Sequence, residues 1–446
     1  MTSTDRLIWC EYAVLPAGVA EGVTIEVAGG RCTTVTTDTE PQTGGDRRAG
    51  ITLPGAANTH SHAFHRALRH RSQTGRGSFW TWREQMYAIA EALDPDRYHR
   101  LARAVFAEMT LAGFTAVGEF HYVHHQADGS PYAEPNAMGL ALVEAARDAG
   151  VRITLLDTIY LHGGLDAGGY RPLEGAQRRF GDGSFDGWAE RVAAVAPAPH
   201  LRIGAAVHSV RAVDPAAIAA VGEWAGGAPL HAHVSEQRAE NEACHAAHAS
   251  SPTEVFDRAG AVTPTFTAVH ATHATDGDVD ALGRADAAVC LCPTTERDLG
   301  DGVGPASRLA RAGVTLAIGS DSHAVVDPFE EARLIELHER LVTGARGVFD
   351  AGDLAATMHA GHQALGWDDA GSIDAGQRAD LVTVSLSTPR TAGATLAPDL
   401  TAVVFAAGAA DVTHVTIDGV DVVADRRHAT VDVATEMPAA IEELTP

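Results

Sequence analysis

Eight short apolar runs, rich in β-branched residues, recur through the middle of the chain, and this alternation is the feature that most restricts its fold. Helical stretches separate the runs, among them Pro95–Ala112, Ala137–Ala149 and Pro215–Trp224. Apolar strands that alternate with helices are typical of parallel βαβ units, and eight such units predict a closed (β/α)8 barrel of the TIM type. The expected strands lie near Thr52–Thr59, Thr115–His121, Arg152–Thr158, Arg202–His208, Leu230–Ser235, Phe266–His270, Ala287–Cys292 and Thr315–Ser320.

Both ends of the chain carry further β-type segments, joined by Gly, Thr and Asp turn signals. LIWCEYAVL and VTIEVAGGRCTTV lie before residue 50, whereas ADLVTVSL, LTAVVFAAG and DVTHVTIDGVDVVAD follow residue 375. We expect the ends, residues 1–50 and 376–446, to meet in one small β-sandwich domain. The α/β barrel, residues 51–375, is then inserted between them. A length of 446 residues suits a barrel plus a smaller module.

The formal net charge of −25 indicates that neither nucleic acid nor an anionic membrane is a partner of this chain. No run of about 18 uncharged apolar residues predicts a membrane span, and the N-terminus lacks a basic leader with a cleavage site. We therefore expect a cytoplasmic protein. The five cysteines form no C-x-x-C pair, and Cys290 and Cys292 are expected to be buried core thiols.

Polar residues gather where the expected strands end, and in a (β/α)8 barrel this face carries the active site. The first strand ends in HSH (60–62), the fifth in HAHVSE (231–236) and the eighth in GSDSH (319–323). Histidines two apart on an extended segment point to the same side, so both can bind one ion. A set of imidazoles and a carboxylate suits zinc, and it also accepts iron, cobalt or manganese.

Longer segments carry a family resemblance. PGAANTHSHAFHRAL, HAHVSEQ, VHATH, IGSDSH and GSIDAGQRADLVTV resemble the amidohydrolase superfamily over nearly the whole chain. Within that superfamily the chain is most similar to formimidoylglutamate deiminases of histidine degradation. The segments that carry this likeness are SFWTWREQMY (78–87), EFHYVHH (119–125), HSVRAV (208–213), SEQ (235–237) and DLGDG (298–302).

The resemblance implies ligands and catalytic roles. It implies one Zn²⁺ held by His60, His62, His233 and Asp321. Asp321 would also accept a proton from the attacking water, and Glu236 would be the proton shuttle. His270 would orient the water or polarise the substrate. Binuclear relatives bridge two metals with a carboxylated lysine, but all 33 basic residues here are arginine, which predicts a mononuclear site.

Two arginines indicate the class of substrate. Arg83, expected in the loop after the first strand, and Arg211, just beyond the fourth, can each bind a carboxylate bidentately. They predict a small dicarboxylate substrate. The resemblance adds Tyr122 and His208 to the substrate pocket. His65 stands where the family often has glutamine, and its imidazole can still donate a hydrogen bond to the substrate.

Three hypotheses for the function follow. The first is zinc-dependent hydrolysis of N-formimidoyl-L-glutamate to N-formyl-L-glutamate and ammonia in histidine catabolism. The resemblance implies that such an enzyme is a homodimer. The second is an aminohydrolase acting on a purine, pterin or triazine ring, which would need stacking aromatic side chains. The third is a non-catalytic, metal-free barrel that binds a ligand, and the presence of Glu236, His270 and Asp321 argues against it.

Overall fold

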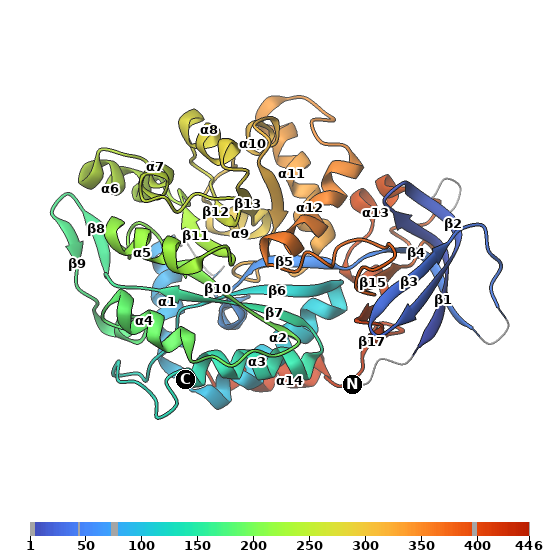
Figure 1. Cartoon of the computed structure of the whole chain (residues 1–446), viewed down its shortest axis with the longest axis horizontal. Coiled ribbons are helices and arrows are strands. Elements are labelled where there is room, and N and C mark those ends of the chain that lie inside the picture. The colour runs from blue at the N-terminus through green and yellow to red at the C-terminus, as the bar shows by residue number, and fades with distance from the viewer. Residues whose placement is uncertain (1–4, 43–44, 73–78, 395–398, 446) are drawn as a thin grey trace.

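The computed structural model describes residues 5–42, 45–72, 79–394 and 399–445, and its two largest sheets each have eight strands (Figure 1). Ser78, which belongs to one segment of the family resemblance, lies outside the described residues. One sheet is entirely parallel and forms the barrel. Its strands, in order around the barrel, are β5 (Ala56–Ser61), β6 (Phe114–His121), β7 (Arg152–Ile159), β10 (Leu201–Val207), β11 (Leu230–Val234), β12 (Phe266–His270), β13 (Ala288–Leu291) and β14 (Thr315–Ile318).

The barrel closes between the end of β5 and the residues that follow β14. The backbone N–H of Asp321 donates to the carbonyl of His60 at 3.0 Å, and the N–H of His62 donates to the carbonyl of Asp321 at 3.2 Å. The closing hydrogen bonds therefore join three residues that were predicted to bind one metal. The predicted (β/α)8 barrel is confirmed.

Helices follow the barrel strands and cover the outside of the barrel (Figure 1). Asp94 caps the helix predicted at Pro95–Ala112 by accepting from the N–H of Arg97, and Gly113 ends it in the left-handed region at φ 105°. The helices of the barrel region are α1 (Phe79–Ala92), α2 (Pro95–Ala112), α3 (Ala137–Ala149), α4 (Phe185–Ala193), α5 (Pro215–Ala225), α6 (Arg238–His248), α7 (Pro252–Arg258), α8 (Asp276–Arg284), α9 (Pro293–Leu299), α10 (Ala306–Arg311), α11 (Pro328–Thr343) and α12 (Ala351–Ala364).

The second sheet is built from both ends of the chain, as the sequence predicted, and lies beside the barrel (Figure 1). Its edge folds back on itself, because Cys32 N–H donates to Gln377 O and Ala379 N–H donates to Gly30 O, both at 2.9 Å. This curvature encloses a small separate core. The strands are β1 (Arg6–Leu15), β2 (Gly18–Ala28), β3 (Arg31–Thr36), β4 (Asp46–Pro54), β15 (Leu381–Val384), β16 (Val412–Ile417), β17 (Val420–Ala424) and β18 (Arg427–His428).

The single strand predicted at Thr52–Thr59 is wrong. The chain instead changes sheets at Gly55: β4 ends at Pro54 in the terminal sheet, and β5 begins at Ala56 in the barrel. A Cβ atom at Gly55 would lie 2.3 Å from the side chain of Thr115, so only glycine fits this crossing. The run of apolar residues on both sides of the crossing hid it from the sequence pattern.

The C-terminal region is not entirely β-structure. The β-type segment expected at LTAVVFAAG is wrong: these residues form α13 (Leu400–Ala406), which Asp399 caps by accepting from the N–H of Ala402. A further helix, α14 (Val433–Glu442), packs against α2 of the barrel. Arg103 of α2 forms an ion pair with Glu436 and donates to the carbonyl of Thr430 at 3.0 Å. Within the described residues, no helix combines the length and apolar character needed to cross a membrane.

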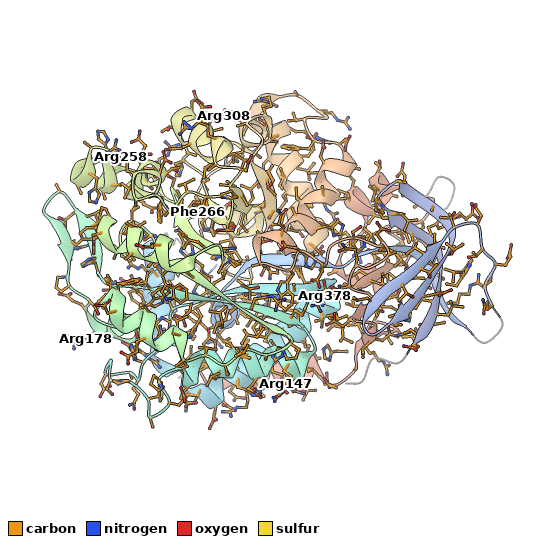
Figure 2. The ribbon with its side chains drawn as sticks, in the orientation of Figure 1. Arg147, Arg178, Arg258, Phe266, Arg308 and Arg378 are labelled. Carbon is orange, nitrogen blue, oxygen red and sulfur yellow. The ribbon has the colours of Figure 1, made fainter. Side chains whose placement is uncertain are left out.

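A buried ion pair joins the barrel to the terminal sheet. Arg152 of β7 pairs with Asp380, and both side chains are 1% exposed. Asp418 lies beside this pair and is also bound by Arg378 at 2.8 Å; Figure 2 shows Arg378 between the barrel and the terminal sheet. We expect Arg152→Met to lower the free energy of unfolding by about 3–5 kcal/mol, because it leaves Asp380 buried without its cation.

Chemical denaturation would measure this loss. Arg284→Met is the matched control, because Arg284 and Asp257 form an ion pair whose side chains are 67% and 45% exposed. An exposed pair contributes roughly 0–1 kcal/mol, so the control variant should unfold close to the wild type. Equal stabilities of the two variants would show that the buried pair does not join the domains.

Candidate active site

One cavity of about 110 Å³ opens at the carboxyl ends of the barrel strands. Every candidate site residue from the sequence lines it, except His60 and His270, which lie behind its wall. The lining candidates are His62, His65, Arg83, Tyr122, His208, Arg211, His233, Glu236 and Asp321. The fold therefore brings all the predicted site residues to one place.

Three imidazoles and one carboxylate form a tight cluster in the wall. The Nε2 atom of His233 lies 3.2 Å from that of His60 and 3.3 Å from that of His62. Asp321 Oδ1 lies 3.4 Å from His60 Nε2 and 3.5 Å from His62 Nε2. Ligands at about 2.0–2.2 Å from a tetrahedral metal ion are roughly 3.3–3.6 Å apart, so this spacing is that of a metal site.

The hydrogen bonds of two of these histidines test whether the cluster fits a cation. His62 Nδ1–H donates to the carbonyl of Phe120 at 2.9 Å, and His233 Nδ1–H donates to the carbonyl of His208 at 2.8 Å. Because a carbonyl only accepts, each ring keeps its proton on Nδ1, and both Nε2 atoms carry lone pairs. Two lone pairs 3.3 Å apart repel each other unless a cation lies between them.

Burial keeps these imidazoles neutral. It lowers the pKa of His60 and His62 well below the usual value, with neighbouring imidazoles adding to the effect, and lowers that of His233 to about 4. A neutral imidazole is the form that binds a metal. The residues present therefore fit a divalent metal ion held by His60, His62, His233 and Asp321.

Three groups can move protons at this site: Asp321 of the cluster, and His270 and Glu236 beside it. Burial raises the pKa of Asp321 to about 7, and the charges of Glu236 and Glu296 act in the same direction. Burial opposes a charged His270, but its hydrogen bond with Glu296 and the nearby acids raise its pKa to about 10. Burial also disfavours ionised Glu236, but the charges of His270 and Arg211 lower its pKa overall.

Arg211 and Arg83 reach the cavity from different elements. Arg211 follows β10, and its Nη2 lies 3.4 Å from Glu236 Oε2, while its Nε lies 3.9 Å from Glu240 Oε1. Arg83, which was expected in a loop, lies instead on α1, with its guanidinium carbon 5.2 Å from the centroid of the Tyr87 ring. The WREQMYAIAEA segment carries no turn residue, and this signal for a helix was available in the sequence.

The remaining candidates form the aromatic side of the cavity. His65 Nε2 and the Tyr122 hydroxyl are 2.9 Å apart, and Trp82 packs edge-on against His65 with ring centroids 4.9 Å apart. His208 packs against Tyr122 and Tyr160, with centroids at 5.5 Å and 4.5 Å. Burial lowers the pKa of His65 and His208 well below the usual value, so both present neutral rings to a ligand.

Three buried acids beside the site were not singled out from the sequence. Glu240 accepts from the N–H of Glu236 at 3.1 Å, and Glu296 lies 3.3 Å from His270 Nδ1. Glu119 of β6 accepts from Ser61 Oγ at 2.6 Å and from Ala63 N–H at 2.7 Å, which fixes the backbone on both sides of His62. Glu119 stands after the apolar run TAVG near the end of an expected strand, and polar residues at strand ends were the signal that drew attention to Asp321.

His124 and His125, in the loop after β6, are buried. Their N–H groups donate to the carbonyl of Arg179 at 2.9 and 3.0 Å, so the loop folds under the η2 segment (Gly175–Arg179). Cys290 and Cys292 are buried, as predicted, with their sulfur atoms 4.0 Å apart.

Residues 51–422 match the Amidohydrolase family. The chain belongs to this family. It is 38% identical over 439 residues, 95% of each chain, to formimidoylglutamate deiminase of Pseudomonas aeruginosa. It is 26% identical over 398 residues to 5-methylthioadenosine/S-adenosylhomocysteine deaminase of Natronomonas pharaonis, covering 87% of this chain and 84% of that one.

Solved structures agree with this assignment. An amidohydrolase from Brucella melitensis superposes with a TM-score of 0.88 at 33% identity, covering 98% of this chain and 99% of that chain. An adenosine deaminase from Xanthomonas campestris with bound zinc superposes with a TM-score of 0.84 at 25% identity, covering 98% and 97%. This amidohydrolase is thus an enzyme that hydrolyses a C–N bond, and the non-catalytic hypothesis is set aside.

Proposed function

We propose that this amidohydrolase hydrolyses N-formimidoyl-L-glutamate to N-formyl-L-glutamate and ammonia, as a zinc enzyme of histidine catabolism. The observation that carries the proposal is one cavity in which two arginines, Arg83 and Arg211, lie with the His/Asp cluster. The similarity to the Pseudomonas aeruginosa formimidoylglutamate deiminase over 95% of both chains supports the choice of substrate.

His60, His62, His233 and Asp321 would hold the metal ion. A bound divalent ion lowers the pKa of a coordinated water toward neutrality and so supplies a nucleophile near pH 7. Zinc suits three imidazoles and one carboxylate, and the relative from Xanthomonas campestris was solved with bound zinc.

The residues around the cluster carry out the proton transfers. Asp321 accepts a proton from the attacking water as its oxygen adds to the formimidoyl carbon. Glu236, buried in the cavity wall, relays the water's two protons to the nitrogen of the tetrahedral carbon, the first by way of Asp321 and the second from the hydroxyl group as the carbonyl forms, so that the C–N bond breaks and ammonia leaves. His270 donates a hydrogen bond toward the reacting group from behind Asp321, whose Oδ2 lies 3.8 Å from His270 Nε2.

Arg83 and Arg211 would bind the two carboxylates of the glutamate part, which places the formimidoyl group at the metal cluster. Arg211 is within 4.0 Å of two carboxylates, those of Glu236 and Glu240. A substrate carboxylate would therefore compete with these acids for the guanidinium group. Tyr122, His65 and His208 would line the middle of the substrate.

Ammonia release from N-formimidoyl-L-glutamate tests the proposal, before and after the enzyme is stripped with a chelator and then reloaded with zinc. We expect rapid release with N-formylglutamate as the second product, loss of activity on stripping and recovery with zinc. No release by a folded, zinc-loaded enzyme would reject the substrate. Undiminished activity in the demonstrably metal-free enzyme would reject the metal dependence.

A ring aminohydrolase is the second candidate, and the aromatic lining of the cavity favours it. Trp82, Tyr87, Tyr122, Tyr160 and Phe180 all contribute to this lining. Aromatic faces stack well on heterocycles, and one relative at 26% identity is a 5-methylthioadenosine/S-adenosylhomocysteine deaminase. Deamination of a purine without turnover of formimidoylglutamate would select this candidate.

We expect Arg211→Met to raise KM for the dicarboxylate substrate roughly 10–100-fold, because a charge-assisted hydrogen bond in a buried pocket contributes about 1.5–3 kcal/mol. Steady-state kinetics would measure the effect. Arg171→Met is the matched control: Arg171 also lines the cavity, but its side chain is 63% exposed. An unchanged KM in Arg211→Met, or an equal rise in KM in the control, would contradict the binding of a substrate carboxylate by Arg211.

We also propose that the enzyme is a homodimer, which is the state that the family resemblance implies. Sedimentation velocity at micromolar concentration would test this. A single species with the mass of one 46.5 kDa chain would reject it.

A further inference from the structure

The side chain of Glu296 lies directly behind His270, and none of the steps above uses it. Glu296 belongs to the first turn of α9, the short helix that starts immediately after β13. Its Oε1 atom lies 3.3 Å from His270 Nδ1 and also accepts from the N–H of Cys292 at 2.9 Å. The two residues are 3% and 1% exposed, so water does not compete for this contact.

The other end of the His270 ring is directed at the reaction centre. Its Nε2 atom is buried without a hydrogen-bond partner in the described part of the chain. That nitrogen lies 3.8 Å from Asp321 Oδ2. A buried imidazole nitrogen without a partner is costly, and such a group is expected where a substrate or water completes the hydrogen bond.

The backbone at His270 is strained as well. His270 has φ +73° and Ala271 has φ +50°, a region that residues other than glycine rarely adopt. Such strain persists where the surrounding structure holds it in place, and it is concentrated at functional sites. The surrounding structure therefore fixes the orientation of the His270 ring, and Glu296 is the side chain in contact with its Nδ1 atom.

We propose that Glu296 is the positioning residue of His270: its carboxylate holds Nδ1–H, so that Nε2 points to the reacting group beside Asp321. An ionised carboxylate accepts hydrogen bonds and donates none, so Glu296 binds the Nδ1–H group of the ring. This contact leaves Nε2 as the nitrogen that faces the reaction centre. A 180° turn of the ring would break this contact. The proposal rests on the proposed function in one respect, that His270 acts on the group being hydrolysed.

Two other acidic side chains near His270 have partners of their own. Asp301 receives a hydrogen bond from the Gln237 side chain, and Glu236 is paired with Arg211 at 3.4 Å. Glu331 makes the same kind of buried contact as Glu296 but at another place. It accepts from the N–H of Thr294 at 3.0 Å, in the same turn of α9, and is 0% exposed. Substitution of Glu331 therefore controls for a loss of activity that results only from distortion of α9.

The test compares Glu296→Leu, Glu296→Gln and the control Glu331→Gln in the zinc-loaded enzyme. We expect Glu296→Leu to lower kcat roughly 100-fold with KM within about threefold, the size of effect expected from a misplaced proton donor. Glu296→Gln keeps an acceptor oxygen but loses the charge assistance, so its kcat should recover to within about 10-fold of the wild type. Glu331→Gln should change kcat less than about threefold.

A double-mutant cycle with His270→Asn separates positioning from general structural damage. If Glu296 acts through His270, Glu296→Leu should cost less than about threefold in kcat when His270 is already Asn. If the fold losses in kcat of the two single variants multiply in the double variant, the two residues act independently and the proposal is overturned. A Glu296→Gln variant as inactive as Glu296→Leu, or a Glu331→Gln loss as large as theirs, would overturn it too.

The kinetics use any substrate that the wild-type enzyme deaminates, so rejection of formimidoylglutamate leaves the proposal testable. Crystal structures of the wild type and Glu296→Leu give a readout that needs no substrate. We expect the imidazole of His270 to turn or move in the variant while the rings of His60, His62 and His233 stay in place. An unmoved His270 ring would overturn the positioning role even if the proposed substrate is correct.

Discussion

Asp321→Asn should abolish turnover, lowering kcat by at least roughly 10³-fold, while the protein stays folded. The backbone explains why the fold should survive. Asp321 joins β14 to β5 through its own N–H and carbonyl groups, and asparagine keeps both. Its φ of +42° lies in the left-handed region, which asparagine adopts more readily than most residues. The change therefore removes the negative charge and the proton acceptor and little else.

The measurement is kcat together with bound metal per chain and the midpoint of thermal unfolding. Asp278→Asn serves as the matched control, because Asp278 is equally buried but caps α8, where it accepts from the N–H of Thr275 at 2.8 Å. The control should keep kcat within about threefold. Near-normal turnover in Asp321→Asn would remove this carboxylate from the mechanism.

The metal ligands could be predicted from sequence because each belongs to the end of a barrel strand. His60, His62 and His233 lie on or just after β5 and β11, and parallel strands bring their carboxyl ends to one face of the barrel. Strand order and strand ends are local properties that apolar, β-branched runs reveal. The cluster of neutral imidazoles is then a consequence of the topology.

Contacts between side chains of elements that are separate in the sequence could not be predicted in this way. Glu296 meets His270 only because the first turn of α9 folds behind β12, and 26 residues separate the two. In the sequence, Glu296 looks like an ordinary acid in the first turn of a helix. The same holds for Arg211, whose contacts with Glu236 and Glu240 depend on how α6 packs against the loop after β10.

The crossing at Gly55 shows a different limit of sequence analysis. The residues on both sides of it are apolar and buried, so strand periodicity continues through the change of sheet. The deciding fact is the close approach of the Thr115 side chain to this glycine. A pattern of single residues along the chain does not contain such a distance.

Glu236→Gln should lower kcat by roughly 10²–10⁴-fold, because a glutamine cannot pass a proton from the nucleophile to the leaving nitrogen. KM should stay the same or fall. Glu236 pairs with Arg211 at 3.4 Å, and removing its charge frees the guanidinium for a substrate carboxylate. Glutamine has nearly the same shape and can stay in the cavity wall, and the backbone N–H of residue 236 still donates to Glu240.

Steady-state kinetics of Glu236→Gln and Glu240→Gln would separate proton transfer from binding. Glu240 is the matched control, because its carboxylate also lines the cavity and lies 3.9 Å from Arg211 Nε. If proximity to Arg211 were the only role of Glu236, both variants would change KM and neither would change kcat. A large loss of kcat in Glu236→Gln, with less than about a tenfold loss in Glu240→Gln, would assign the proton shuttle to Glu236. A rise in KM at constant kcat would instead make Glu236 a binding residue, and the proton carrier would have to be sought among Asp321 and His270.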